Sequence, residues 1–164
     1  MVIRKSTFGD LDSIMALFDI ARMRMRRDGN TTQWIDGYPS RGIAENDIRN
    51  GNSYVLEDEG GAYATFAMIA GEDPTYGHIE GRWPNNLPYV TLHRAASDDR
   101  HHGVLHDILQ WVCGQYDNVR IDTHKDNHRM IHIAEKEGFA YCGVIYVANG
   151  TPRNAYQKVS DSSR

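Results

Sequence analysis

The stretch DTHKDNHRMIHIAEKEGFAYC, residues 122–142, decides the fold, because each of its parts has a mechanical role. Asp126 or Asn127 can begin a helix, since a short side-chain oxygen accepts a hydrogen bond from a helix N–H that would otherwise have no partner. Gly138 ends that helix in the left-handed conformation, and Phe139 then folds back on its last turn. Strand patterns lie directly before and after the stretch, which therefore predicts strand, helix and strand in succession.

The rest of the chain also alternates between strand-like and helix-like patterns, which places it in the α/β class. The predicted strands are Val2–Lys5, Ser53–Glu57, Ala62–Ala70, Tyr89–Ala96, Asn118–Ile121, Tyr141–Val147 and Arg153–Val159. Three further helices are predicted over 11–27, 41–49 and 102–116, with Thr7 and Ser40 placed to cap the first two. Arg22, Arg24, Arg26 and Arg27 suit the C-terminal end of the first helix and are expected to form a solvated face.

Two segments carry aromatic side chains but no regular pattern. Residues 28–39 are predicted to form a loop with two exposed aromatic residues, Trp34 and Tyr38. Residues 71–88 are rich in Gly, Pro and Asn, so no regular element is expected there. Structureless loops of this length are usually functional or disordered, and Trp83 argues against disorder.

Length and composition indicate a single domain over residues 1–164, with residues 160–164 as a frayed tail. The net charge is −4 and no basic stripe is present, so nucleic acid is not an expected partner. No apolar run approaches the roughly 18 residues that span a bilayer, and no secretory signal is recognisable, so a cytoplasmic protein is expected. Cys113 and Cys142 are expected to be reduced, mostly buried thiols.

A candidate phosphate-binding loop lies at Ser97–Gly103, between a predicted strand and a predicted helix. A strand that leads through a Gly-containing loop into a helix directs backbone N–H groups and the positive end of the helix dipole at one point, where phosphate binds. The Arg-x-x-Gly pattern of Arg100 and Gly103 is equally compatible, by itself, with an ordinary helix start.

Together, this loop and the opening stretch resemble the GNAT superfamily of N-acetyltransferases over roughly residues 89–147. The superfamily's signature is Gln or Arg, two residues, Gly, one residue, then Gly or Ala; Arg100 and Gly103 match it, whereas Leu105 departs from it. The resemblance implies the GNAT acyl-CoA N-acyltransferase fold, a mixed, mostly antiparallel central sheet flanked by about four helices. It also implies acetyl-CoA as cofactor, held by Ala95, Ala96, Ser97, Arg100, His101, His102, Gly103, Val104, Leu105 and Asn127.

The resemblance further implies direct transfer of the acetyl group to an amine. A lysine-like amine has a pKa of ~10.4, so its deprotonation at pH 7 costs about 4–5 kcal/mol and a general base is expected. The candidates are Glu80 in the long loop and His93 in the strand before the phosphate loop, although His93 is also compatible with a sheet-face residue. In many relatives, a Tyr five residues before the Phe of the Gly-Phe stop supplies the proton that the departing thiolate of coenzyme A needs. This chain has Ala134 at that position, so Tyr141 or Tyr146 is the candidate substitute.

The acceptor pocket is predicted under the aromatic segments, with Trp34, Tyr38 and Trp83 as substrate-binding residues. The alternative is that these aromatic residues only fix the loops to the core. His124, His128 and His132 have a spacing that can bind zinc, but Arg129 stands where a metalloprotease carries Glu, so no metal site is predicted.

Three interpretations remain. The first is an N-acetyltransferase that moves an acetyl group from acetyl-CoA to an amine of a small molecule or peptide. The second is a catalytically weak relative that binds acyl-CoA as a sensor or scaffold, and the third is a metal hydrolase. The expected partners include neither nucleic acid nor membrane, and a homodimer is left open.

Overall fold

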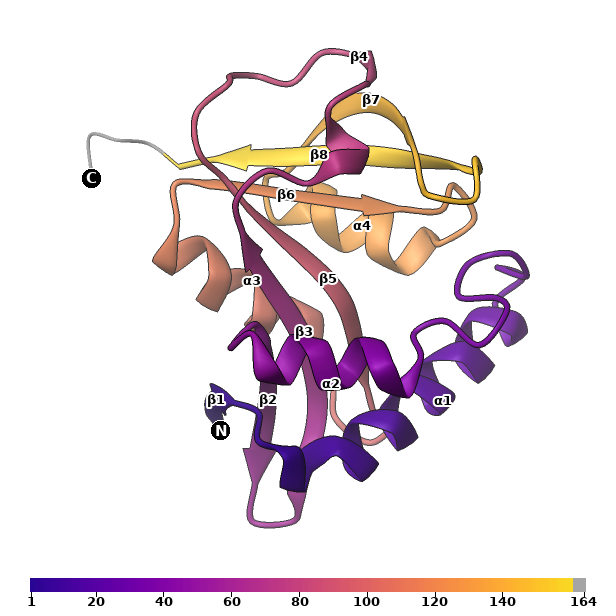
Figure 1. The fold of residues 1–164 in the computed structure, drawn as a ribbon, viewed down its shortest axis with the longest axis vertical. Helices are drawn as coiled ribbons and strands as arrows, with labels where there is room; N and C mark the ends of the chain where they lie inside the picture. The colour runs from indigo at the N-terminus through magenta and orange to yellow at the C-terminus, as the bar shows by residue number, and fades with distance from the viewer. Residues whose placement is uncertain (161–164) are drawn as a thin grey trace. The chain divides into compact units, whose positions relative to one another are not determined.

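The structure is a computed structural model that describes residues 1–160 (Figure 1). Eight strands and four α-helices are assigned in this part of the chain. The strands follow the order β1-β2-β3-β5-β6-β8-β7-β4. β5 pairs with β6 in parallel, whereas the pairs β1–β2, β2–β3, β6–β8, β7–β8 and β4–β7 are antiparallel. The predicted mixed, mostly antiparallel sheet with four helices is therefore confirmed.

The chain divides into two compact units. The first contains Met1–Met68 and His93–Val104, and the second contains Ile69–Leu92 and the chain from Leu105 onward. Strand β5, Val90–Ser97, contributes residues to both. The single domain expected over residues 1–164 stays a prediction.

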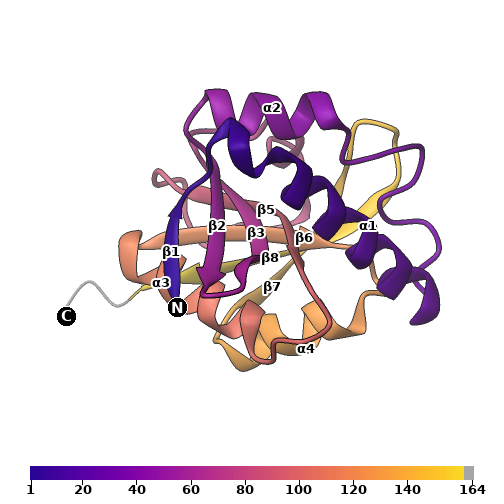
Figure 2. The ribbon, with the colours of Figure 1, turned by 90° about the horizontal axis from the view of Figure 1, so that it is seen from below.

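In the first unit, two helices cover one face of an antiparallel sheet (Figure 2). The strands are β1 (Val2–Lys5), β2 (Ser53–Asp58) and β3 (Gly61–Ala70), and the helices are α1 (Leu11–Arg27) and α2 (Arg41–Arg49). The apolar face of α1, with Ile14, Leu17 and Phe18, is buried against Ala44 of α2 and Val55 of β2. The helical spacing of these residues in the sequence therefore produces the core of this unit.

Both predicted caps are present in the first unit. The backbone N–H of Thr7 donates to the Asp10 carboxylate at 2.7 Å, in a 3₁₀ turn (Phe8–Asp10) that leads into α1. The Ser40 hydroxyl accepts the N–H of Ile43 at 3.2 Å and so begins α2. Each contact satisfies a donor that the first turn of a helix leaves unpaired.

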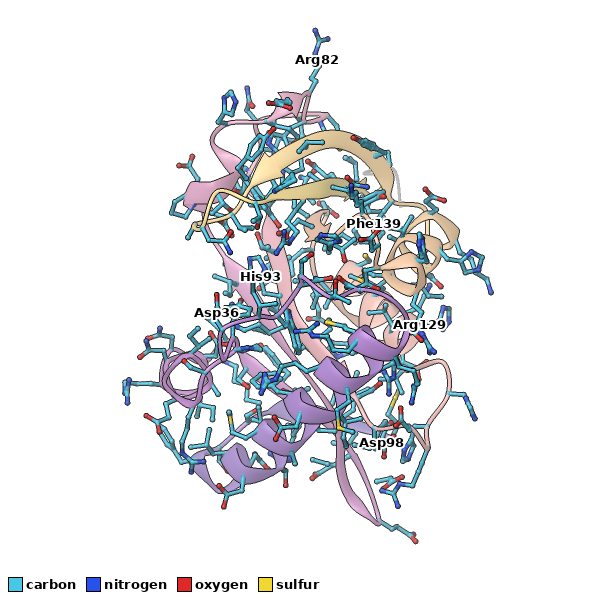
Figure 3. All side chains as sticks on the ribbon, turned by 90° about the vertical axis from the view of Figure 1, so that its right-hand side faces the viewer. Asp36, Arg82, His93, Asp98, Arg129 and Phe139 are labelled. Carbon is cyan, nitrogen blue, oxygen red and sulfur yellow. The ribbon has the colours of Figure 1, made fainter. Side chains whose placement is uncertain are left out.

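The second unit is built on antiparallel strands, with β8 paired between β6 and β7. Its strands are β4 (Glu80–Gly81), β6 (Asn118–Thr123), β7 (Ala140–Tyr146) and β8 (Pro152–Val159), and its helices are α3 (Val104–Gln115) and α4 (His128–Lys136). Asn127 caps α4, because its side-chain oxygen accepts the N–H of Met130 at 3.2 Å. Gly138 has φ +90°, and Phe139, labelled in Figure 3, donates its N–H to Ala134 at 2.9 Å. The predicted start and stop of this helix are confirmed.

Residues 71–88 are more ordered than their composition suggests. A 3₁₀ turn covers Pro74–Tyr76, and β4 pairs with β7 through Gly81 and Gly143. Tyr76 is buried with Ile145 and Ala155, and Trp83 packs against this cluster. The expectation of no regular element is therefore wrong for these short segments, because the aromatic side chains anchor the loop on the sheet.

The last residues of the chain differ from the expected frayed tail at its first position. The N–H of Ser160 donates to the carbonyl of Asp117 at 2.7 Å, and Ser160 is buried. Residues 161–164, which belong to the same prediction, lie outside the described part of the chain. Within residues 1–160, none of the helices has the length and apolar character to cross a bilayer.

Candidate functional site

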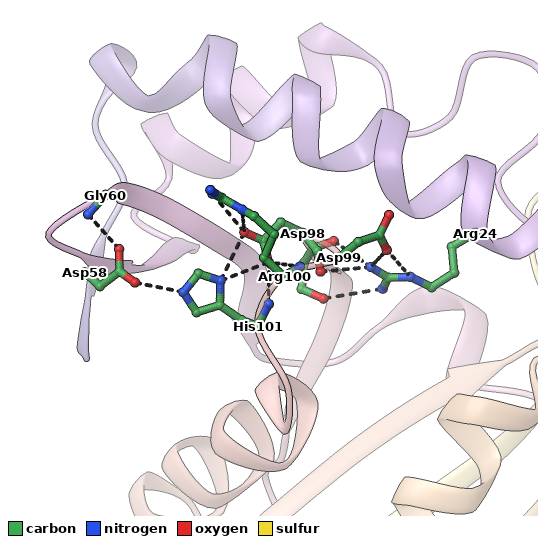
Figure 4. Close-up of polar contacts among 8 residues, drawn as sticks. Arg24, Asp58, Gly60, Asp98, Asp99, Arg100 and His101 are labelled. Carbon is green, nitrogen blue, oxygen red and sulfur yellow. Dashed lines mark hydrogen bonds and ion pairs between the residues drawn. The ribbon is translucent and has the colours of Figure 1, made fainter.

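The predicted phosphate loop leaves β5 at Ser97 and reaches α3 at Val104 (Figure 4). Gly103 has φ +70°, a left-handed conformation that glycine adopts without strain and that lets the chain turn into the helix. The residues from Ser97 to Val104 all belong to the first unit, whereas Leu105 belongs to the second. Within the first unit, three sets of polar contacts determine the shape of the loop.

Asp98 forms the centre of the loop. One of its carboxylate oxygens accepts the backbone N–H groups of Arg100, at 3.1 Å, and His101, at 3.0 Å. The side chain is buried, and burial acts to raise the pKa of Asp98. The His101 N–H and ring and the Arg100 N–H outweigh burial and hold this pKa below its ordinary value. An ionised side chain of the protein thus occupies two donors that the sequence assigned to phosphate.

His101 links the loop to the β2–β3 hairpin. Its ring nitrogens lie 2.7 Å from Asp58 and 3.0 Å from Asp98. The ring also stacks on Tyr63, with 3.7 Å between the ring centroids and an interplanar angle of 6°. The hydrogen bond to Asp58, and then the one to Asp98, raises the pKa of His101 above its ordinary value. An imidazole that bridges two carboxylates therefore holds the loop against the hairpin.

Arg24 of α1 holds the other side of the loop. Its guanidinium donates to the carbonyl oxygens of Ser97, at 3.1 Å, and Asp98, at 2.9 Å, and it pairs with Asp99 at 2.6 Å. The prediction that this arginine belongs to a solvated face is wrong, because the turning chain exposes carbonyl groups that need a donor.

Two neighbours of Arg24 are also bonded. Arg22 donates to the carbonyl of Tyr38, and Arg26 donates to those of Asn30, Gln33 and Trp34. The arginines at the end of α1 therefore organise loops, which their surface-like spacing in the sequence did not reveal.

The remaining predicted coenzyme residues differ in accessibility. The Arg100 side chain is 81% exposed, and its guanidinium lies 3.3 Å from Asp98 on the rim of a shallow hollow. His102 and Gly103 are exposed, Val104 and Ala96 are buried, and Ala95, Ser97 and Leu105 are partly exposed. Among residues 1–160, none accepts a hydrogen bond from the N–H of His102 or Gly103. These two donors remain available for an anion.

A strained residue interrupts β5 directly after His93, which is labelled in Figure 3. Arg94 has φ +54°, an uncommon conformation for a residue with a long side chain. Its guanidinium donates to both oxygens of Asp47 at 2.7 Å and to the Tyr38 hydroxyl at 3.1 Å. Burial acts to lower the pKa of Arg94, but Asp47 and Tyr38 more than offset this effect and raise it. The ion pair therefore holds an unfavourable backbone conformation in place.

Trp34 and Tyr38, two predicted substrate-binding residues, lie together in the first unit with ring centroids 6.4 Å apart. The prediction of two exposed rings is wrong for Trp34, which is buried edge-on against Phe18 at 5.5 Å; Tyr38 is partly buried. A left-handed backbone at Trp34, φ 57°, turns the loop back toward α1 and so buries the ring.

The second unit contains the other predicted site residues. Trp83 donates its indole N–H to the carbonyl of Tyr76 at 3.0 Å and stacks on the Arg120 guanidinium at 4.0 Å, contacts that fix the loop. Glu80 is exposed and accepts the Tyr146 hydroxyl at 2.9 Å, and this bond raises the pKa of Tyr146. Tyr141 is 53% exposed.

The two cysteines, His106 and His124 all lie in the second unit. Cys113 and Cys142 are free thiols and are partly rather than mostly buried. Residues 1–160 contain no group of three His, Cys, Asp or Glu side chains that could hold a metal ion. His124 is instead buried beside Asp126, and His106 bonds to Glu137.

Comparison with solved structures gives the family. A GNAT-family acetyltransferase of Streptococcus agalactiae is 35% identical, with a TM-score of 0.89 over 98% of this chain and 96% of that one. A ribosomal-protein-alanine N-acetyltransferase of Brucella melitensis, 18% identical, has a TM-score of 0.62 over 97% and 99% of the two chains. The GNAT-like decarboxylase GphF, in complex with isobutyryl-CoA, is 16% identical with a TM-score of 0.66 over 97% and 99%.

No protein-family model and no curated protein matches the chain. The two structures at 18% and 16% identity establish the fold alone. The streptococcal protein, at 35% identity over almost the whole of both chains, also establishes the family. The fold, the strand–loop–helix order around Gly103 and this identity agree: the chain belongs to the GNAT family of acetyltransferases.

Proposed function

We propose that the chain is an N-acetyltransferase that moves the acetyl group of acetyl-CoA directly to an amine of a small molecule or peptide. The observation that carries the proposal is the loop after β5. Arg24 and His101 hold it in one shape, and the N–H groups of His102 and Gly103 have no acceptor among residues 1–160. Backbone N–H groups that precede a helix are well suited to bind phosphate.

The occupied donors of the loop refine the predicted coenzyme contacts. Because Asp98 accepts the N–H groups of Arg100 and His101, the pyrophosphate takes those of His102 and Gly103 in this proposal. The exposed Arg100 guanidinium supplies positive charge beside them. Asn127 then has two roles, as the cap of α4 and as a contact for the pantetheine arm or ribose.

A pair of substitutions at Gly103 tests the loop. A Cβ atom at this position has no atom within 4 Å, so a side chain can begin in open space in front of the loop, although φ +70° strains most residues other than Gly. Gly103→Trp is expected to abolish calorimetric coenzyme A binding. Gly103→Asn, the control, keeps the left-handed conformation at small cost and is expected to bind. A folded Gly103→Trp protein with unchanged affinity would contradict the loop assignment.

The activity itself is tested by following thiol release from acetyl-CoA with a panel of amines and peptide N-termini. Release that depends on one class of amine supports the proposal. In this proposal Glu80 or His93 is the general base and Tyr141 is the general acid. The variant of the base, Glu80→Gln or His93→Gln, and the variant Tyr141→Phe are expected to lower kcat.

One observation favours a second function, an acyl-CoA-binding sensor or scaffold. The position of the acidic Tyr of relatives is taken by Ala134, which is completely buried, so no hydroxyl can reach a thiolate from there. Tight coenzyme binding without thiol release for any amine would favour this second function over catalysis.

A further inference from the structure

Tyr76 and Asp122 form a hydrogen-bonded pair on one face of the sheet of the second unit. The Tyr76 hydroxyl donates to one carboxylate oxygen of Asp122, Oδ2, at 2.6 Å. Tyr76 is 3% exposed, with its ring centroid 5.1 Å from that of Trp83 and 6.2 Å from that of Tyr89. Burial, and then the charge of Asp122, raises the pKa of Tyr76 well above its ordinary value. The phenol therefore stays protonated and fixes the orientation of the carboxylate.

The second oxygen of Asp122, Oδ1, remains open. Among residues 1–160, none donates a hydrogen bond to it, and it is not one of the buried polar atoms that lack a partner. Asp122 is also only partly buried. An oriented carboxylate with one oxygen accessible is an arrangement that receives a donor from outside the chain.

Among the described residues of the second unit, no cation forms an ion pair with this carboxylate. Arg120, two residues earlier on the same face of β6, donates instead to Gln157 and to the carbonyl of Asn85. Its guanidinium lies between the rings of Trp83 and Tyr89, at 4.0 and 3.9 Å from their centroids. The aromatic rings thus hold Arg120 in cation–π contact, and within the described residues no ion pair joins it to Asp122.

Thr91 supplies a second polar group on the same face. It pairs with Arg120 across the parallel β5–β6 ladder, so its side chain and that of Asp122 point to the same side of the sheet. Asp122 follows Arg120 by two residues, so it lies diagonally across from Thr91 on this face. Thr91 is 1% exposed as a residue, and its buried hydroxyl has no hydrogen-bond partner among residues 1–160. A buried hydroxyl without a partner is unfavourable and is expected to be satisfied by a ligand or water.

We propose that Asp122 and Thr91 form a binding site for a cationic primary amine, with Tyr76 as the positioning residue. Asp122 Oδ1 and the Thr91 hydroxyl accept N–H groups of the ammonium. Assigning this amine as the acetyl acceptor rests on the proposed function, whereas the binding of a cation does not.

Calorimetry with two probes, 1,5-diaminopentane and the amidated peptide Ala-Ala-Ala, tests the site in the presence of coenzyme A. At least one probe is expected to bind the unmodified protein, and its N-acetylated form is expected to bind at least tenfold more weakly. Asp122→Asn keeps the size of the side chain and is expected to weaken probe binding about tenfold or more. Asp117→Asn removes an exposed carboxylate of the same unit and is the matched control, with unchanged affinity expected.

A kinetic readout separates this site from a structural role. Asp122→Asn is expected to raise the KM for the amine while the KM for acetyl-CoA and the melting temperature hold, and Tyr76→Phe is expected to give a smaller change in the same direction. Absent binding of both probes, or equal affinity in Asp122→Asn and the unmodified protein, overturns the proposal. Probe binding through Asp122 without thiol release supports the cation site and instead contradicts the acetyltransferase function.

Discussion

The ion pair between Asp47 and Arg94 leads to a quantitative prediction for Asp47→Asn, a substitution that removes one charge and preserves shape. Both side chains are 12% exposed, and two N–O distances of 2.7 Å join them. Charges about 4 Å apart at an effective dielectric constant of 20 attract by about 4 kcal/mol. Removing one partner of a buried pair typically costs about 3–5 kcal/mol, since the other charge stays buried. Because both partners keep some exposure, we expect a loss of about 3 kcal/mol.

Urea denaturation followed by circular dichroism measures this loss, and a decrease in melting temperature of roughly 6–12 °C is expected for a chain of this length. Glu45→Gln on the same helix is the matched control, because its contact with Arg41 is longer, at 3.7 Å, and exposed. Such surface pairs contribute about 0–1 kcal/mol. Similar losses in the two variants would refute the reasoning. The double variant Asp47→Leu, Arg94→Met removes both charges and is expected to recover most of the stability.

Three further substitutions test the loop and the cap. The pKa of His101 is raised in the folded protein, so its stabilising contribution is complete below pH ~6.5 and decreases as the pH rises through the folded pKa. His101→Gln should therefore flatten the fall of melting temperature above pH 6.5, whereas His102→Gln should not; equal slopes would contradict this. Arg24→Gln should raise the KM for acetyl-CoA severalfold and Arg27→Gln, at an exposed site, should leave it unchanged. Asn127→Ala should cost about 1 kcal/mol of stability and raise the KM for acetyl-CoA by more than a cap alone explains; an unchanged KM would leave it a cap only.

Local rules of the sequence predicted the elements whose causes lie within a few residues. The cap at Asn127 and the stop at Gly138 depend on contacts between neighbours in the chain, and the structure has both. The order of strand, loop and helix around Gly103 followed from the same kind of reasoning. The site roles of these residues stay predictions.

Contacts between distant parts of the chain were not predictable in this way. Arg24 and Ser97 are separated by 73 positions, Asp47 and Arg94 by 47, and Tyr76 and Asp122 by 46. Spacing in the sequence shows which face of an element is apolar, but not which partner a polar side chain meets after folding. An arginine at a helix end is thus read as solvated, although the folded chain brings carbonyl groups to it.

The close approach of Gly81 and Gly143 has a consequence for association between chains. A Cβ atom on either glycine would lie 2.2 Å from a carbonyl oxygen of the opposite strand, so the pairing of β4 with β7 excludes any larger residue at both positions. An open strand edge invites pairing with another chain and aggregation. Here the chain covers part of the edge of β7 itself and ends the sheet with a strand of two residues that begins with a charged Glu80. Substitution of Gly143 should release β4 and expose the unpaired edge of β7. Aggregation is therefore the expected phenotype.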